Sequence, residues 1–328
     1  MNPQVITISS SADARIRTTA IFEVEKAKLI AQSESFRTLF NGEMCEESNL
    51  GEIPLEQDQI KAITILFHCL HKGTNKTGLG TPPVNVTDVT TADIWYLVLA
   101  CIKYRVEMKS DIFKKWFKTW YDAQEKDTKF HAEVMFPAYA FDDASAFKST
   151  THALVYNCHW HIREYDPTSV KDVHLPLRII QQLDAARGRL RNVLHNSLFD
   201  QAATLLSDDG CNCRFATFYN YFKELKRIEV WPLENTMKHA SINMLLYRLT
   251  EFDPAAVRAK HLPPCATCDK NWDMVVWHAT NDGRDPEHEY WFSHTIKQWG
   301  RFCRISHGNP TWYFSYMGRR EKRGLISD

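Results

Sequence analysis

Residues 20–40 constrain the fold more than any other part of this chain, because two different apolar periods follow one another there. Phe22 and Val24 alternate with two glutamates, which predicts a strand with one apolar and one solvated face. The apolar residues after them recur at the spacing of one helical stripe: Leu29, Phe36 and Phe40. Ser33 lies within that stretch and is predicted to cap a second short helix. A strand that leads directly into a helical hairpin indicates an α+β domain.

The flanking segments add the other elements of this domain. Residues 4–10 alternate in polarity and predict a strand. Residues 57–72 carry apolar side chains every three or four positions, which predicts a helix with Asp58 as its cap. Thr90 and Asp93 have the spacing of a capping box, which predicts the start of the next helix.

The order of these motifs resembles the BTB/POZ domain. In that family a strand with the pattern F-x-V-H-K leads into a helix, and S-x-x-F then packs a helical hairpin. The matching residues of this chain are Phe22, Val24, Lys26, Ser33 and Phe36. Residues 46–48, 53–55 and 100–104 resemble later segments of the family pattern. The resemblance covers residues 5–121, and Glu25 stands where the family has its histidine.

The polar stretch at residues 122–130 is the predicted end of this domain. Later segments, above all the long amphipathic helix predicted at 176–199, resemble the extension of fungal BTB/POZ proteins; residues 274–279 are interpreted as a strand. The predicted domains are a BTB/POZ domain at 1–125, a helical extension at 126–207 and a C-terminal module at 208–328. The predicted fold class is α+β: a BTB/POZ fold, with a small β-sheet capped by helical hairpins, followed by a mostly α-helical extension and a small module rich in cysteine and aromatic residues.

Two close cysteine pairs in the C-terminal module predict a structural zinc site. The pairs are Cys211 with Cys213 and Cys265 with Cys268, and His261 is a reserve ligand. Both pairs lie in turn-like sequence, and four thiolates around Zn²⁺ make a closed tetrahedral site. The alternative is that these are buried or free cysteines that are paired only in sequence. Two other clusters, His68 with His71 and residues 158–161, are interpreted as a packed helix edge and a helix exit rather than metal sites.

Composition and motifs argue against several classes of function. Lysine plus arginine and aspartate plus glutamate number 40 each, so the formal net charge is zero, which argues against a general nucleic-acid or membrane-surface binder. No apolar run approaches the roughly 18 residues of a membrane span, and no secretory signal is visible. The nine cysteines predict a reducing, intracellular compartment, nucleus or cytoplasm. Phosphate-binding loops, nucleophile elbows and zinc-protease motifs do not occur in the sequence, which favours a protein that is not an enzyme.

The resemblance implies a non-enzymatic adaptor that binds other proteins and, in some family members, docks to a cullin-3 ubiquitin ligase scaffold. The family docks that scaffold through regions that correspond to residues 40–48 and 97–106 here. The alternative function is a nuclear nucleic-acid-binding or transcription-regulatory protein that uses the C-terminal Cys/His module and the basic tail at 319–323. The charge balance makes nucleic acid the weaker interpretation.

Self-association is a further property that the resemblance implies. Dimeric members of the family place an aspartate near an arginine that follows the strand phenylalanine. The corresponding residues here are Asp13 and Glu23. Two acids in one pocket repel each other, so the sequence argues against the charged-pocket dimer of the family.

Overall fold

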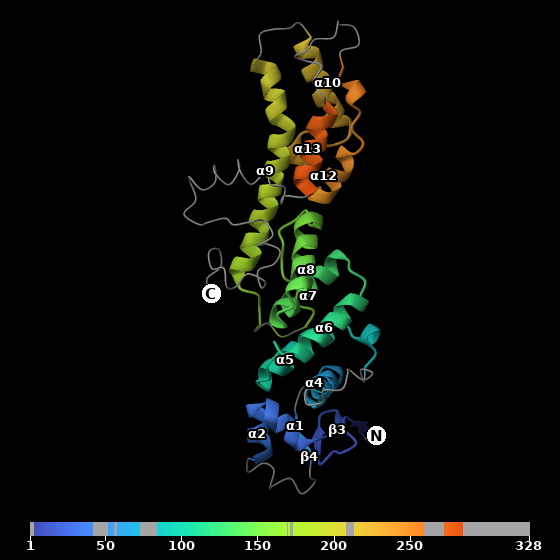
Figure 1. The fold of residues 1–328 in the computed structure, drawn as a ribbon, viewed down its shortest axis with the longest axis vertical. Coiled ribbons are helices and arrows are strands. Elements are labelled where there is room, and N and C mark those ends of the chain that lie inside the picture. Colours follow the sequence, from blue (N-terminus) through green and yellow to red (C-terminus); the bar gives the residue numbers. More distant parts are fainter. Residues whose placement is uncertain are drawn as a thin grey trace. The chain divides into compact units, whose positions relative to one another are not determined.

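A computed structural model describes residues 3–41, 52–55, 58–72, 84–168, 170, 173–207, 213–258 and 272–284. The chain divides into two compact units (Figure 1). Unit 1 contains Met1–Phe147 and Glu164–Leu175, and unit 2 contains Lys148–Arg163 and Pro176–Asp328. Each unit has its own buried apolar core.

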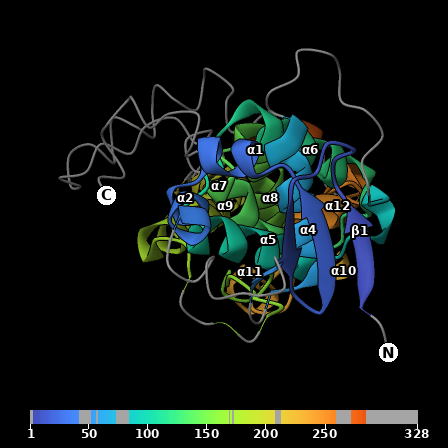
Figure 2. The ribbon, with the colours of Figure 1, turned by 90° about the horizontal axis from the view of Figure 1, so that it is seen from below.

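Unit 1 begins with a four-stranded sheet in which β1 lies at an edge (Figure 2). The strands are β1 (Gln4–Thr7), β2 (Ala14–Arg17), β3 (Ala20–Val24) and β4 (Glu52–Pro54), in the spatial order β1-β3-β2-β4. β3 pairs in parallel with β1 and antiparallel with β2, and β4 pairs in parallel with β2. The strand predicted around Phe22 and Val24 is confirmed, and both side chains are fully buried.

Helices cover the sheet and complete unit 1. They are α1 (Lys26–Gln32), α2 (Glu34–Asn41), α4 (Ile60–Lys72), the 3-10 helix η1 (Val86–Asp88), α5 (Thr91–Lys103), α6 (Asp111–Ala123) and α7 (Thr128–Ala140). α4 packs on the sheet, because the ring of Phe67 meets that of Phe22 edge-on with 5.4 Å between centroids. The predicted capping box is confirmed at the start of α5, where Thr90 and Asp93 bond to each other's backbone N–H.

Buried tryptophans link α5 and α6 to their neighbours. The indole N–H of Trp95 on α5 donates to the backbone oxygen of Glu133 on α7, at 2.7 Å. The indole N–H of Trp120 on α6 donates to the oxygen of Val89, at 2.9 Å. Both tryptophans therefore bury a large apolar surface without leaving a donor unsatisfied.

The helical hairpin breaks at Ser33, as the sequence predicts. The Ser33 hydroxyl accepts a hydrogen bond from the backbone N–H of Phe36, at 3.0 Å, which caps α2. The same hydroxyl donates to the backbone oxygen of Tyr104, at 2.5 Å, just beyond the end of α5. Ser33 also forms an isolated antiparallel bridge with Val106. The Ser33 side chain thus caps the N-terminus of α2 and fixes the position of the segment after α5.

Unit 2 is helical in the residues that the structure describes. Its helices are the later part of α8 (Ala144–Asn157), α9 (Leu177–Ser207), α10 (Arg214–Arg227), α11 (Leu233–Thr236), α12 (Ile242–Leu249), the 3-10 helix η2 (Pro254–Ala256) and α13 (Trp272–Arg284). α10, α12 and α13 lie along α9 (Figure 1). The amphipathic helix predicted at 176–199 lies within α9, and its apolar stripe of Leu183, Leu190, Leu194 and Leu198 is buried. Tyr221 of α10 donates its hydroxyl to the Leu198 oxygen at 2.8 Å.

The prediction of a strand at residues 274–279 is wrong, because this segment lies inside α13. The buried apolar side chains of α13 include Trp272, Val276 and Ala279, which recur at the spacing of one helical face. A short apolar run cannot be assigned to a strand or a helix from periodicity alone. The helical stripe of α13 becomes clear only when Trp272, which precedes the run, is included.

Replacing Ser33 by alanine is expected to lower the free energy of unfolding by about 1–3 kcal/mol. The change leaves the buried Phe36 N–H and the Tyr104 oxygen without the partner that they share. Urea denaturation measures the loss. Ser110→Ala is the matched control, because Ser110 stands at the N-cap of α6 without a side-chain capping bond, so its effect should stay within about 0.5 kcal/mol. Equal losses of unfolding free energy in Ser33→Ala and Ser110→Ala would contradict the role given to the Ser33 hydrogen bonds.

Candidate interaction surface

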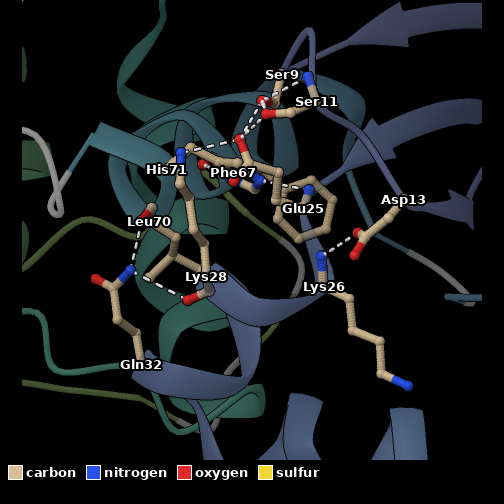
Figure 3. Close-up of polar contacts among 10 residues, drawn as sticks. All are labelled: Ser9, Ser11, Asp13, Glu25, Lys26, Lys28, Gln32, Phe67, Leu70 and His71. Carbon is tan, nitrogen blue, oxygen red and sulfur yellow. Dashed lines mark hydrogen bonds and ion pairs between the residues drawn. The ribbon is translucent and has the colours of Figure 1, made fainter.

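A polar junction sets where α1 starts, at the point where β3 ends (Figure 3). The backbone N–H of Glu25 donates to Nε2 of His71 on α4, at 2.8 Å. Nδ1 of His71 lies 2.7 Å from the Phe67 oxygen, which can only accept. The proton therefore sits on Nδ1, and the imidazole is neutral. Burial lowers the pKa of His71, which agrees with the neutral form.

The side chain of Glu25 ties the loop after β1 to α1. Its carboxylate accepts hydrogen bonds from the hydroxyls of Ser9 and Ser11 and from Nζ of Lys28 (Figure 3). Hydrogen bonds from Ser9, Lys28 and Ser11 lower the pKa of Glu25 to about 2. Glu25, which stands where the family has its histidine, thus holds this junction as an anion. The imidazole in the junction belongs to His71 of α4, which accepts the Glu25 N–H.

Asp13 and Glu23 each have polar partners of their own, and the argument against the charged-pocket dimer stays a prediction. Asp13 accepts the backbone N–H of Lys26 at 2.7 Å, near the start of α1. Glu23 accepts hydrogen bonds from Thr7 and from Arg15, each at 2.9 Å. These bonds lower the pKa of Glu23, whereas a neighbouring acid would raise it. Arg15 lies directly opposite Glu23 in the β2–β3 ladder. The comparison of Asp13 with Glu23 alone did not consider this cation.

The segment after α5 is held in place by contacts on two sides. The ring of Tyr104 stacks on that of Phe36 from α2, with 4.7 Å between centroids. The Tyr104 hydroxyl donates to Asp58 at 2.5 Å, and Nζ of Lys103 lies 2.8 Å from the same carboxylate oxygen. Burial and the Asp58 carboxylate raise the pKa of Tyr104 well above its ordinary value, so the hydroxyl keeps its proton. Asp58 was predicted to cap α4, and its carboxylate instead bonds to the end of α5.

Three exposed side chains project from this anchored segment: Ile102, Lys103 and Arg105. We call them the α5-end surface. Ile102 is 46% exposed although most apolar residues of α5 are buried. Arg105 has a φ of 50°, a left-handed conformation that turns the chain sharply after Tyr104. An exposed aliphatic side chain beside two cations, on a backbone fixed from both sides, is suited to contact with another protein.

The predicted zinc ligands are mostly outside the described residues: Cys211, Cys265, Cys268 and the reserve ligand His261. Cys213 is described, and it is buried at the N-cap of α10. The zinc site therefore stays a prediction. The basic tail at 319–323, on which the nucleic-acid alternative depends, also lies outside the described residues.

The other histidine clusters do not form metal sites within the described part of the chain. No group there brings together three or more side chains able to hold a metal ion. His71 is used in the junction with Glu25, and the imidazole of His68 is half-buried, which lowers its pKa to about 4. Nδ1 of His161 lies 3.7 Å from Asp184 and the side chain is exposed.

Comparison with known proteins identifies one domain. Residues 9–109 match the family model of the BTB/POZ domain. Neither a curated protein nor a solved structure matches the chain. In the described residues, no helix combines the length and apolar character that crossing a membrane requires.

The Glu25 junction predicts a specific response to acid. Since the pKa of Glu25 falls from 4.5 to about 2 on folding, its charge stabilises the folded state fully above the unfolded pKa, and this contribution is lost as the pH falls towards 2. Glu25→Gln should cost on the order of 1–2 kcal/mol at neutral pH, after discounting for solvent screening. The difference from wild type should shrink as the pH is lowered below 4.5.

Denaturation curves across this pH range measure the difference. Glu34→Gln is the control, because Glu34 forms only an exposed pair with Arg37 one turn away. A difference between wild type and Glu25→Gln that is independent of pH would show that the charge of Glu25 does not hold the junction.

Proposed function

Because residues 9–109 form a BTB/POZ domain, we propose that the chain is a non-enzymatic adaptor that binds a partner protein through the α5-end surface. BTB/POZ domains are protein–protein interaction modules that also self-associate. The match to this domain is the observation that carries the proposal. The fixed backbone around Ile102 and Tyr104 supports it, because a rigid surface loses little conformational entropy on binding.

The partner that we propose is the N-terminal region of cullin-3. The sequence resemblance points to two docking regions, residues 40–48 and 97–106. The second contains the whole α5-end surface. Phe40, at the start of the first region, belongs to α2, which Phe36 and Ser33 attach to the segment after α5. The described start of the first region, Phe40 and Asn41, is thus attached to the second region through α2.

Titration calorimetry of the full chain with the cullin-3 N-terminal region tests this partner. We expect binding at micromolar concentration or tighter, and Ile102→Glu should weaken it at least roughly tenfold because it places a charge in the apolar contact. The matched control is Leu177→Glu, since Leu177 is 70% exposed and belongs to unit 2. Circular dichroism checks that both variants fold.

Two results would contradict the proposal. No complex with the wild-type chain at micromolar concentration would remove the ubiquitin ligase role. Binding that Ile102→Glu leaves unchanged, or that both variants weaken equally, would show that the α5-end surface is not the contact.

We further propose that Cys211, Cys213, Cys265 and Cys268 hold a structural zinc ion in unit 2. Four thiolates would close the coordination shell, leave no position for water, and contribute on the order of 10 kcal/mol to folding. Protein purified without chelator should carry about one equivalent of zinc, and Cys265→Ser/Cys268→Ser should lose it and melt at lower temperature. Wild-type protein with less than about a tenth of an equivalent would exclude the site. Unchanged zinc in the double variant would mean that other residues bind it.

A further inference from the structure

Helix α10 packs on the core of unit 2 with one face and carries a second, aromatic face that stays partly exposed. The inner face is buried: Thr217, Tyr221, Glu224 and Leu225. The outer face carries four aromatic residues at helical spacing: Phe215, Phe218, Tyr219 and Phe222. Phe215 is 63% exposed and Tyr219 is 65% exposed, while Phe218 and Phe222 are partly exposed. A surface helix usually has one apolar stripe, so the second stripe calls for a physical explanation.

Two neighbouring rings extend this stripe into a broader surface. The ring of Phe222 contacts that of Trp231 at 4.6 Å and stacks on Phe199 of α9 at 5.8 Å. Phe199 and Trp231 also contact each other, with 5.2 Å between centroids. Both side chains are partly exposed. We call the six residues Phe199, Phe215, Phe218, Tyr219, Phe222 and Trp231 the α10 aromatic face.

This face has the composition of an interface centre rather than of an ordinary protein surface. Contiguous exposed apolar groups are rare on soluble proteins and mark contact sites. Aromatic side chains are enriched among the residues that dominate binding energies, because they bury a large area and have few rotatable bonds. The mutual packing of Phe199, Phe222 and Trp231 fixes their rings before any partner arrives, which reduces the entropy lost on binding.

Charge around the aromatic face indicates the chemistry of its partner. Lys223 follows Tyr219 by one helical turn, and Lys226 follows Phe222 in the same way. Both lysines are exposed, and neither forms an ion pair among the described residues. Arg214 lies over the ring of Phe215, at 4.7 Å from its centroid. The acid of α10, Glu224, is buried and bonded to Arg227, so α10 presents no exposed carboxylate.

We propose that the α10 aromatic face binds a segment of a partner protein that carries aromatic or large aliphatic side chains together with carboxylates. The apolar side chains cover the exposed rings, and the carboxylates pair with Lys223 and Lys226. This binding site lies in unit 2 and is separate from the BTB/POZ domain. It extends the proposed adaptor function and does not depend on the α5-end surface. The two proposals can fail separately, because the α5-end surface is tested with Ile102→Glu and cullin-3, whereas this site is tested with α10 variants and a selected peptide.

Selection of random peptides of about twelve residues, displayed on phage, against the full-length chain tests the proposal. The enriched sequences should combine acidic residues with at least one aromatic or large aliphatic residue. A fluorescent peptide with the most enriched sequence then serves as the probe in anisotropy titrations. Phe215→Ser/Tyr219→Ser should weaken its binding at least roughly tenfold, and Lys223→Glu/Lys226→Glu should weaken it and reduce its salt dependence.

Met244→Ser/Tyr247→Ser is the matched control, because Tyr247 is 66% exposed on α12 and resembles Tyr219 in type and exposure. This control should bind the probe as the wild type does, and circular dichroism should show that all variants fold. Failure to enrich any sequence, enrichment of sequences without acids, or equal binding by the aromatic and control variants would each overturn the proposal. A wild-type dimer that Phe215→Ser/Tyr219→Ser abolishes would also overturn it, because a second copy of this chain would then cover the face.

Discussion

A single buried hydroxyl, that of Ser33, joins the start of α2 to the segment after α5, which lies 71 residues away in the chain. It bonds to the Phe36 N–H in the first turn of α2 and to the Tyr104 carbonyl just after α5, so neither polar group is buried without a partner. The ring of Phe36 then stacks on Tyr104, and Tyr104 reaches Asp58. The exposed side chains at the end of α5 depend on this arrangement, because these contacts and the Val106 bridge fix the backbone that carries them to the rest of unit 1.

Short-range patterns in the sequence predicted several elements of the BTB/POZ domain. The alternation at Phe22 and Val24, the cap at Ser33 and the box at Thr90 each depend on residues within one or two turns. The second bond of Ser33 spans 71 residues, and the Glu25–His71 bond spans 46. No local pattern signals such pairs, so the sequence predicted the elements of the candidate surface but not what fixes it.

Two expectations from the sequence left out a decisive partner, because that partner lay outside the motif considered. Arg15, on the neighbouring strand, lowers the pKa of Glu23, and the comparison with the family's charged pocket did not include it. The strand predicted at 274–279 is helical because Trp272, just before it, starts a buried stripe that packs on Tyr221 of α10. Fold and domain type therefore follow from sequence more readily than the sites do, since sites combine distant side chains.

We propose that this chain binds other proteins through the α5-end surface. Quantitative mass spectrometry of proteins that co-purify with the tagged full-length chain and with its Ile102→Glu variant tests the claim most directly. We expect a defined set of partners that the wild type retains and the variant loses, while the Leu177→Glu chain retains them. The same partners at the same abundance with all three chains would contradict it.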